Sequence, residues 1–314
     1  MTRQAVVVGI DIAKSWFDVA VLESGESFRL SNDVAGWKAL IGRLRRFSVA
    51  AVGLEPSGGY ERGLGAALHK AGLPVRNVNP HKLRHYGRAL GVLAKTDSID
   101  ALLIARYTAQ MPTRPLRADP VGRQLGDLVA ARRQLSDDRV RLANQLEQVR
   151  EAVVRRIFMA RLKRLATDIL IIDKRLDQLV AGDPQLARKD SLIQSLCGAG
   201  PVLSHTLLAF APELGDADRR QIAALAGLAP YDHQTGVFRG KPSIWGGRPE
   251  VRRVLYMAAL TASRSNPTLR TFHQRLIAAG KPPKVALVAV ARKLLTILTA
   301  MLRTNQPWAE PNPA

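Results

Sequence analysis

The sequence predicts a multidomain chain with an α/β domain at its N-terminus and helical parts after it. Strand and helix signals alternate over residues 5–110, whereas the apolar positions follow a heptad rhythm over residues 121–181. The 314 residues, of which 46% are hydrophobic, suffice for two or three domains with cores of their own. We expect these domains at residues 1–115, 116–183 and 184–314.

The first domain is expected to hold a central sheet. Residues 6–12 read as a buried strand, and residues 17–22 follow so soon that they should pair with it antiparallel. The all-apolar residues 50–54 suit a strand in the middle of a sheet that is covered on both faces. We further expect strands over residues 27–30 and 74–78, and helices over residues 37–47 and 58–69. A hairpin meander followed by strand–helix units fits a ribonuclease-H-like α/β domain.

Four carboxylates lie at strand ends or on one helix face of this predicted domain. Asp11 and Glu55 each end an apolar strand, whereas Asp97 and Asp100 have the i, i+3 spacing of one helix face. A carboxylate that ends a buried strand is costly unless it is paired or bound to a metal. Together the four predict an oxygen-ligand site for Mg²⁺ or Mn²⁺, and two ions in such a site stabilise the attacking and leaving oxygens of a phosphodiester.

Simpler interpretations of these acids stay open. Asp11 could cap a turn at the end of its strand, and Asp97 could be only the N-cap of the helix that carries Asp100. Asp18, on the next strand, is the rival carboxylate, and we expect it to face solvent.

The charge indicates the kind of substrate. A net charge of +21 favours a nucleic-acid partner, because Lys and Arg displace the counterions of phosphates, although a ribosome-like or adhesive surface is the alternative. The single cysteine, Cys197, excludes a disulfide framework and favours a reducing, cytoplasmic compartment; we expect it to be buried. We identify no signal peptide, and we expect no bilayer-spanning segment and no membrane partner.

The heptad region predicts a coiled-coil arm. Its phase slips between Val153 and Phe158, which predicts a stutter or a reversal, and Gly182-Asp183-Pro184 ends it. The arm is either a helical spacer within one subunit or a dimerising or antiparallel-paired element. Its outer arginines form either a solvated face or a contact surface for RNA or DNA backbone: Arg132, Arg133, Arg139, Arg141, Arg155, Arg156, Arg161 and Arg164.

The last domain is expected to be mostly helical. Residues 195–204 resemble the hairpin of a helix-hairpin-helix, whose glycines let backbone N–H groups approach a phosphate, although a tight helix turn is the alternative. A loop rich in Gly, Lys and Arg follows from Tyr231 to Arg248. Further helices are expected over residues 251–263 and 285–302.

Nearly the whole chain resembles the DEDD-type insertion-sequence transposases that are guided by a bridge RNA. Each motif is weak alone, but their order is distinctive. The motifs are Gly-Ile-Asp-Ile-Ala-Lys (9–14), Leu-Glu-Pro-Ser-Gly-Gly-Tyr (54–60), Asn-Pro (79–80), Lys-Thr-Asp-Ser-Ile-Asp-Ala (95–101), Cys-Gly-Ala-Gly-Pro (197–201), Ala-Gly-Leu-Ala-Pro (226–230), Gly-Gly-Arg (246–248) and Leu-Tyr-Met-Ala-Ala-Leu (255–260).

The resemblance implies a Holliday-junction-resolvase-like N-terminal domain, a coiled coil and a C-terminal transposase domain. It implies Mg²⁺ at the four DEDD acids, a structured bridge RNA that selects the target, and double-stranded DNA at the element ends. It also implies a hydroxyl nucleophile that becomes covalently attached to DNA. Because each strand end must be held while partners exchange, we expect a homodimer that assembles into a tetramer.

The position of the nucleophile departs from the family pattern. The family carries a Ser-Gly pair after Gly-Leu-Ala-Pro, whereas this chain reads His233-Gln234-Thr235-Gly236. Threonine has the same hydroxyl chemistry, but its γ-methyl crowds the attack and restricts χ1. Thr235 could be the nucleophile, Ser243 could replace it, or this copy could be slow or decayed; Thr235-Gly236 could also be an ordinary turn.

Two other functions remain open at this stage. The first is a metal-dependent nuclease or junction resolvase that uses water as its nucleophile. The second is a catalytically inactive nucleic-acid-binding protein with the same fold.

Overall fold

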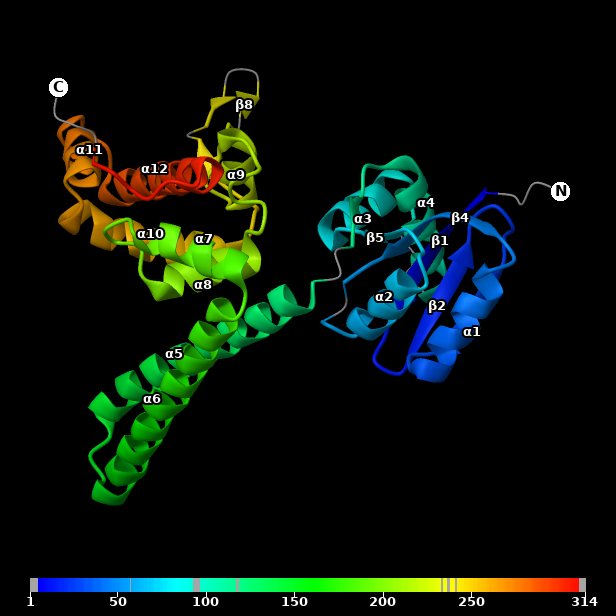
Figure 1. The fold of residues 1–314 in the computed structure, drawn as a ribbon, viewed down its shortest axis with the longest axis horizontal. Helices are drawn as coiled ribbons and strands as arrows, with labels where there is room; N and C mark the ends of the chain where they lie inside the picture. The colour runs from blue at the N-terminus through cyan, green and yellow to red at the C-terminus, as the bar shows by residue number, and fades with distance from the viewer. Residues whose placement is uncertain are drawn as a thin grey trace. The chain divides into compact units, whose positions relative to one another are not determined.

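The chain forms two compact units, Met1–Ala118 and Asp119–Ala314 (Figure 1). The computed structural model describes residues 5–56, 58–92, 97–116, 119–232, 234–235, 238–240 and 242–310, with only the backbone described for five of them: Asp97, Ser98, Gln234, Phe238 and Arg239. Each unit has its own hydrophobic core.

The N-terminal unit is built on a six-stranded mixed sheet in the order β3-β2-β1-β4-β5-β6. Its strands are β1 (Ala5–Ile12), β2 (Trp16–Val21), β3 (Ser27–Ser31), β4 (Ser48–Leu54), β5 (Val75–Asn77) and β6 (Arg114–Pro115). β1 to β3 form the predicted antiparallel meander, and β4 pairs parallel with both β1 and β5. The α/β prediction is confirmed. β6, which pairs antiparallel with β5, was not predicted because two residues that include a proline show no alternation.

The two faces of this sheet are covered differently. Val8, Ile10 and Ile12 of β1 point to one face, where they share a core with α1 (Val34–Leu44) and α2 (Glu61–Lys70). On the opposite face α4 (Asp97–Gln110) lies directly on glycines. A Cβ added to Gly9 would stand 2.1 Å from the carbonyl oxygen of Ala101. Helix α3 (Pro80–Ala89), which directly precedes α4 in the chain, packs against it through a small cluster that includes Tyr86 and Tyr107.

In its described residues, the C-terminal unit is built of helices, connecting loops and two small ladders. Its helices are α5 (Pro120–Gln148), α6 (Ala152–Ala181), α7 (Pro184–Gln194), α8 (Pro201–Phe210), α9 (Arg219–Leu225), α10 (Pro249–Ser265), α11 (Pro267–Ala278) and α12 (Pro283–Thr304). The prediction of a mostly helical C-terminal part is confirmed. α11 was not predicted as a separate helix; it begins at Pro267 behind Asn266, whose side chain accepts a hydrogen bond from the N–H of Leu269 (3.0 Å).

Helices α5 and α6 lie side by side as a long hairpin (Figure 1). The chain reverses at residues 149–151, slightly before the predicted phase slip, and Glu151 caps α6 by accepting from the N–H of Val154 (2.8 Å). Arg132 was expected on the outer face of the arm, and this was wrong. Its guanidinium binds the carboxylate of Asp173 across the two helices (Nη2–Oδ2 3.2 Å), so it joins the hairpin.

The base of the α5–α6 hairpin shares one core with the helices that follow it. Leu125 of α5 and Leu176 of α6 belong to the same cluster as Ile193, Leu255 and Leu294. The base of the predicted arm is therefore part of the C-terminal unit's core.

Two expectations about this unit need correction. α12 is long and apolar enough to cross a membrane, contrary to the expectation, yet eight of its residues are buried in the helical core. It is long and apolar because it packs against α7, α9, α10 and α11. Cys197 is exposed rather than buried, because it precedes the tight turn at Gly198 instead of lying within a helix.

Candidate active site

Asp11 and Glu55 are neighbours at the carboxyl ends of two adjacent parallel strands, β1 and β4. β1 and β4 are parallel neighbours with Gly9 opposite Gly53 and Ile10 opposite Leu54, so the next pair in register is Asp11 and Glu55. Adjacent strands lie roughly 4.8 Å apart, which brings the two carboxylates into reach of one ion. Both side chains are partly buried.

Helix α4 covers the same face of the sheet. Side chains alternate along a strand, so Asp11 shares its face with Gly9, and Glu55 shares its face with Gly53. Added Cβ atoms at these glycines would collide with Ala101 and Thr108 of α4. Asp100 directly precedes Ala101, and Asp97 begins the helix. The structure therefore brings Asp11, Glu55 and the start of α4 to one face.

The chemistry of these donors fits a hard divalent ion. Carboxylate oxygens are the ligands that Mg²⁺ and Mn²⁺ prefer. Among the described side chains, no three His, Cys, Asp or Glu groups stand close enough to hold a metal ion. The side chain of Asp97 lies outside the described part of the chain, as do Lys95 and Thr96 of the same motif.

Asp18 was expected to face solvent, and this was wrong. Asp18 is only 7% exposed, and it lies directly opposite Asp11 in the β1–β2 register. Its carboxylate accepts two hydrogen bonds of 3.1 Å from Nε of Arg29 and one of 2.8 Å from Nη2. Arg29 lies opposite Asp18 on the neighbouring strand β3, and this ion pair allows the carboxylate to be buried. The pairing depends on the strand register, which the sequence alone does not show.

The loops that follow the two strand-end acids are tied together by Asn32. Its Nδ2 donates to the carbonyl oxygens of Ala13 (3.0 Å), after β1, and of Tyr60 (3.1 Å), after β4. Its Oδ1 accepts from the indole N–H of Trp37 (2.9 Å). Sequence reasoning missed Asn32, because nothing in the residues around it shows that two distant loops meet there.

The two candidate hydroxyls lie in nested β-ladders of the C-terminal unit. Thr235 belongs to β8 (Gln234–Thr235), which pairs antiparallel with β9 (Phe238–Arg239). Ser243 belongs to β10 (Ser243–Ile244), which pairs antiparallel with β7 (Pro230–Tyr231). Thr235 and Ser243 are both exposed. The expected irregular loop thus contains two short ladders; His233 and Gly236, beside Thr235, lie outside the described residues.

The base of these ladders is held by close backbone contacts and two arginines. A Cβ added to Gly247 (φ +67°) would stand 2.2 Å from the backbone nitrogen of Gly227, so the motifs Ala-Gly-Leu-Ala-Pro and Gly-Gly-Arg meet here. Arg252 donates to the carbonyl oxygen of Gly246 (2.6 Å). Arg248 makes a bidentate pair with Glu213, with N–O distances of 2.6 and 2.7 Å. These contacts fix the base where the ladders leave the helical core.

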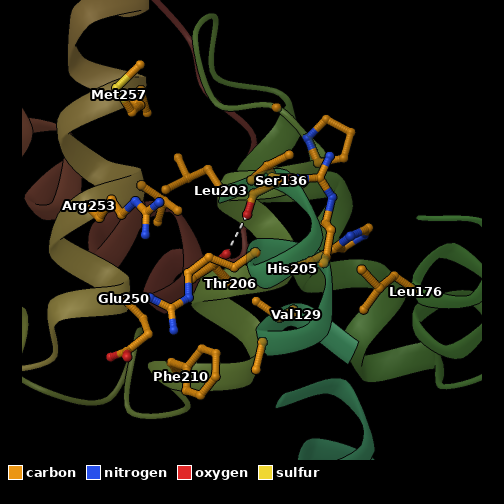
Figure 2. A pocket seen from close by; sticks show the side chains of 18 of the residues that line it. Val129, Ser136, Leu176, Leu203, His205, Thr206, Phe210, Glu250, Arg253 and Met257 are labelled. Carbon is orange, nitrogen blue, oxygen red and sulfur yellow. Dashed lines mark hydrogen bonds between the residues drawn. The ribbon is translucent and has the colours of Figure 1, made fainter. Parts of the chain in front are cut away.

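A separate cavity of about 380 Å³ lies between α5, α8 and α10 (Figure 2). Its lining is mostly apolar, with Val129, Leu203, Phe210 and Met257 among its residues. Arg253 of α10 pairs with Asp137 of α5 at its side. Neither Thr235 nor Ser243 lines this cavity, so it is distinct from the predicted site.

Comparisons with known proteins agree with this architecture. Residues 8–155 match the family model of the DEDD transposases of the IS110 type, and residues 190–274 match that of the transposases of the IS116/IS110/IS902 family. The pilin gene-inverting protein of Moraxella bovis is 29% identical over 328 residues, which cover 96% of this chain and 97% of that protein.

The pilin gene-inverting protein of Moraxella lacunata is also 29% identical, over 96% of this chain and 97% of that protein. An uncharacterized 42 kDa protein of insertion element IS900 from Mycobacterium paratuberculosis is 31% identical over 152 residues, or 45% of this chain and 37% of that protein. Both parts of the chain thus match the same kind of protein, and the chain belongs to the IS110 family of DEDD transposases.

Proposed function

We propose that the chain is a metal-dependent DNA recombinase of an insertion sequence that is guided by a bridge RNA and works through a covalent hydroxyl–DNA intermediate. The observation that carries the proposal is the shared face of Asp11, Glu55 and the start of α4 in the N-terminal unit. We also propose a ribonuclease-H-like, Holliday-junction-resolvase-like role for this unit, which that arrangement supports. The family membership supports DNA as the substrate.

Asp11, Glu55, Asp97 and Asp100 would hold Mg²⁺ or Mn²⁺. The bound ion would draw negative charge from the scissile phosphate and make its phosphorus open to attack. Asn32 would keep the loops behind Asp11 and Glu55 in place, so that both carboxylates keep their orientation.

The hydroxyl of Thr235 is the proposed nucleophile, with Ser243 as the replacement. Its oxygen would form a bond to phosphorus while the bond from phosphorus to the 3′-oxygen breaks, and the hydroxyl proton would pass to that leaving oxygen. The products are a protein–DNA phosphodiester and a 3′-hydroxyl that is ready for strand exchange. The exposed position of Thr235 on a short ladder supports a role in reaching a substrate.

The strand exchange would join donor and target DNA. Two nearly full-length relatives are named pilin gene-inverting proteins, and on this basis we propose inversion as well as insertion as an outcome for this chain. Because each of the exchanging ends must be held, we propose a homodimer that assembles into a tetramer in the bacterial cytoplasm. The domain limits 1–115, 116–183 and 184–314 remain part of this proposal.

The decisive experiment is a recombination assay in cells with the element ends and their flanking non-coding RNA. The parent chain should recombine, whereas Asp11→Asn should fold normally and give no product, because the amide lacks the charge that binds the ion. In vitro, removal of divalent ions with EDTA should stop cleavage, and added Mg²⁺ should restore it. Cleavage without a trapped protein–DNA adduct would favour a water-using nuclease, and no metal-dependent cleavage would favour a binding protein.

The guide RNA needs its own test. With a net charge of +21 and exposed arginines such as Arg141 and Arg164 on the α5–α6 hairpin, the purified protein should carry a structured RNA from its own element. Its affinity for this RNA should fall steeply as salt rises. Equal affinity for an unrelated RNA of the same length across the salt series would contradict a guide role.

A further inference from the structure

Three charged side chains form one row across the N-terminal sheet. Asp11 of β1 stands opposite Asp18 of β2, and Asp18 stands opposite Arg29 of β3. Directly opposed residues of antiparallel strands point to the same face. Arg29 is therefore on the same face as Asp11, two strands away, or roughly 10 Å.

Arg29 is held firmly and still reaches solvent. Asp18 binds it through Nε and Nη2, at 3.1 and 2.8 Å, and the guanidinium carbon lies 5.1 Å from the ring centroid of Trp16. The Asp18 side chain is 10% exposed, whereas that of Arg29 is 50% exposed. Trp16 precedes Asp18 by two residues on β2 and so shares its face. A bidentate ion pair and a cation–π contact fix the direction of a guanidinium.

The position of this arginine suits a DNA backbone. A strand that approaches several carboxylates is repelled by them, and a cation at the edge of the same face offsets that repulsion. Planar guanidinium groups bind phosphate through two parallel hydrogen bonds. The ordered, half-exposed Arg29 therefore provides a ready phosphate contact, whereas a mobile surface arginine would first lose side-chain entropy.

We propose that Arg29, positioned by Asp18 and Trp16, binds a backbone phosphate of the DNA strand that enters the four-acid site. The proposal rests on the proposed function, because it takes DNA at that site as given. Asp18 and Trp16 are positioning residues here, and Arg29 is the group that touches the substrate.

The test measures DNA binding without chemistry. The full-length protein binds a duplex from one end of its own element in EDTA, and fluorescence anisotropy gives the affinity over a series of KCl concentrations. Each phosphate contact contributes about one unit to the slope of log affinity against log salt. Arg29→Ala should reduce this slope by about one unit, and Arg29→Lys, which keeps the charge, should retain it.

Arg46 offers a matched control in the same unit. It also pairs with a carboxylate, Glu26, at 3.3 Å, and its guanidinium also lies over an aromatic ring, that of Phe47. Arg46→Ala should leave the slope unchanged. An equal loss of slope in Arg46→Ala would show a general charge effect and overturn the proposal.

The competing role for Arg29 is to neutralise buried Asp18. That role predicts that Arg29→Ala lowers the unfolding temperature and leaves the slope at its parent value, and this result would also overturn the proposal. The salt series contains no metal and needs no cleavage, so it tests the Arg29 contact independently of the proposed cleavage chemistry. Failure of the proposed function would appear instead as a parent chain that binds DNA and forms no covalent adduct with Mg²⁺.

Discussion

The carbonyl oxygen of Ala101 lies where a side chain of Gly9 would begin, 2.1 Å from an ideal Cβ. The backbone of α4 thus touches the backbone of β1 without any intervening side chain. Asp11 follows Gly9 by two residues and Asp100 directly precedes Ala101, so this contact sets how near the strand acid and the helix acids come to each other.

Gly9→Ala should therefore damage both stability and the acid site. The added methyl would push α4 away from β1, and overpacking of this kind costs about 1–3 kcal/mol. Urea denaturation measures the loss of unfolding free energy. Gly42→Ala is the control, because its added Cβ meets nothing within 4 Å on α1 and should stabilise the helix by about 0.5–1 kcal/mol. Equal free energies for Gly9→Ala and the parent would show that α4 shifts without penalty.

Asn32→Asp should raise the Mg²⁺ concentration that cleavage requires. The carboxylate keeps an acceptor for Trp37 but loses the Nδ2 donor to Ala13 and Tyr60, so the loops behind Asp11 and Glu55 separate. Loss of such a supporting contact costs roughly 10-fold in metal affinity. A Mg²⁺ titration of cleavage measures it.

Two further variants, Trp37→Phe and Asn144→Asp, serve as comparisons for Asn32→Asp. Trp37→Phe removes the bond to Oδ1 and part of the indole that packs on the core, but it keeps both Nδ2 bonds of Asn32, so it should have a smaller effect on the Mg²⁺ requirement. Asn144→Asp makes the same chemical change on an exposed part of α5 and should have none. A Mg²⁺ requirement in Asn32→Asp equal to that of Asn144→Asp would remove Asn32 from the support of the site.

Three substitutions separate the two candidate nucleophiles. If Thr235 attacks the phosphate, Thr235→Ala should lower recombination by at least roughly 1,000-fold, because no oxygen remains to form the covalent bond. Thr235→Ser should match or exceed the parent, since it removes the γ-methyl that crowds the attack. Ser243→Ala, on the neighbouring ladder, should be mild.

The measurement is the yield of protein–DNA adduct after denaturation, alongside the recombination assay in cells. Full activity of Thr235→Ala would move the nucleophile to Ser243 or to water. Because both residues are exposed, loss of activity in either variant cannot be attributed to a disturbed core.

The stability of α9 should depend on pH through Asp218. Hydrogen bonds from the backbone N–H groups of Gln221 and Arg220 lower the pKa of Asp218 below its usual value. A carboxyl group with a lowered folded pKa adds stability above its unfolded pKa, and this stability is lost as pH falls through the folded pKa. The loss should occur below about pH 4.

Asp218→Asn should keep a cap that does not titrate in this range. Thermal unfolding between about pH 6 and pH 3 should then show a smaller decline for Asp218→Asn than for the parent. Asp216→Asn, in the loop just before α9, is the control and should decline as the parent does. Identical declines in all three proteins would contradict the role of Asp218.

Local patterns were enough to predict much of the N-terminal unit. The runs that became β1 and β4 are apolar because both faces of these central strands are covered, and such burial leaves a mark in consecutive residues. The acids at their ends, Asp11 and Glu55, were visible for the same reason, since polar residues stand out where a buried run stops. α12 was also visible as a helix, but its length and hydropathy could not distinguish a core helix from a membrane span.

The sequence by itself determined the α/β and helical character of the two parts and the family, and it supplied the four acids and the two hydroxyls as candidates. Only the tertiary structure decided that Asp18 is buried against Arg29, that Asn32 joins two loops, and that Gly227 meets Gly247. These contacts join residues on different strands, loops or turns. They depend on strand register and on close backbone approach, and neither is encoded in the periodicity of any single segment.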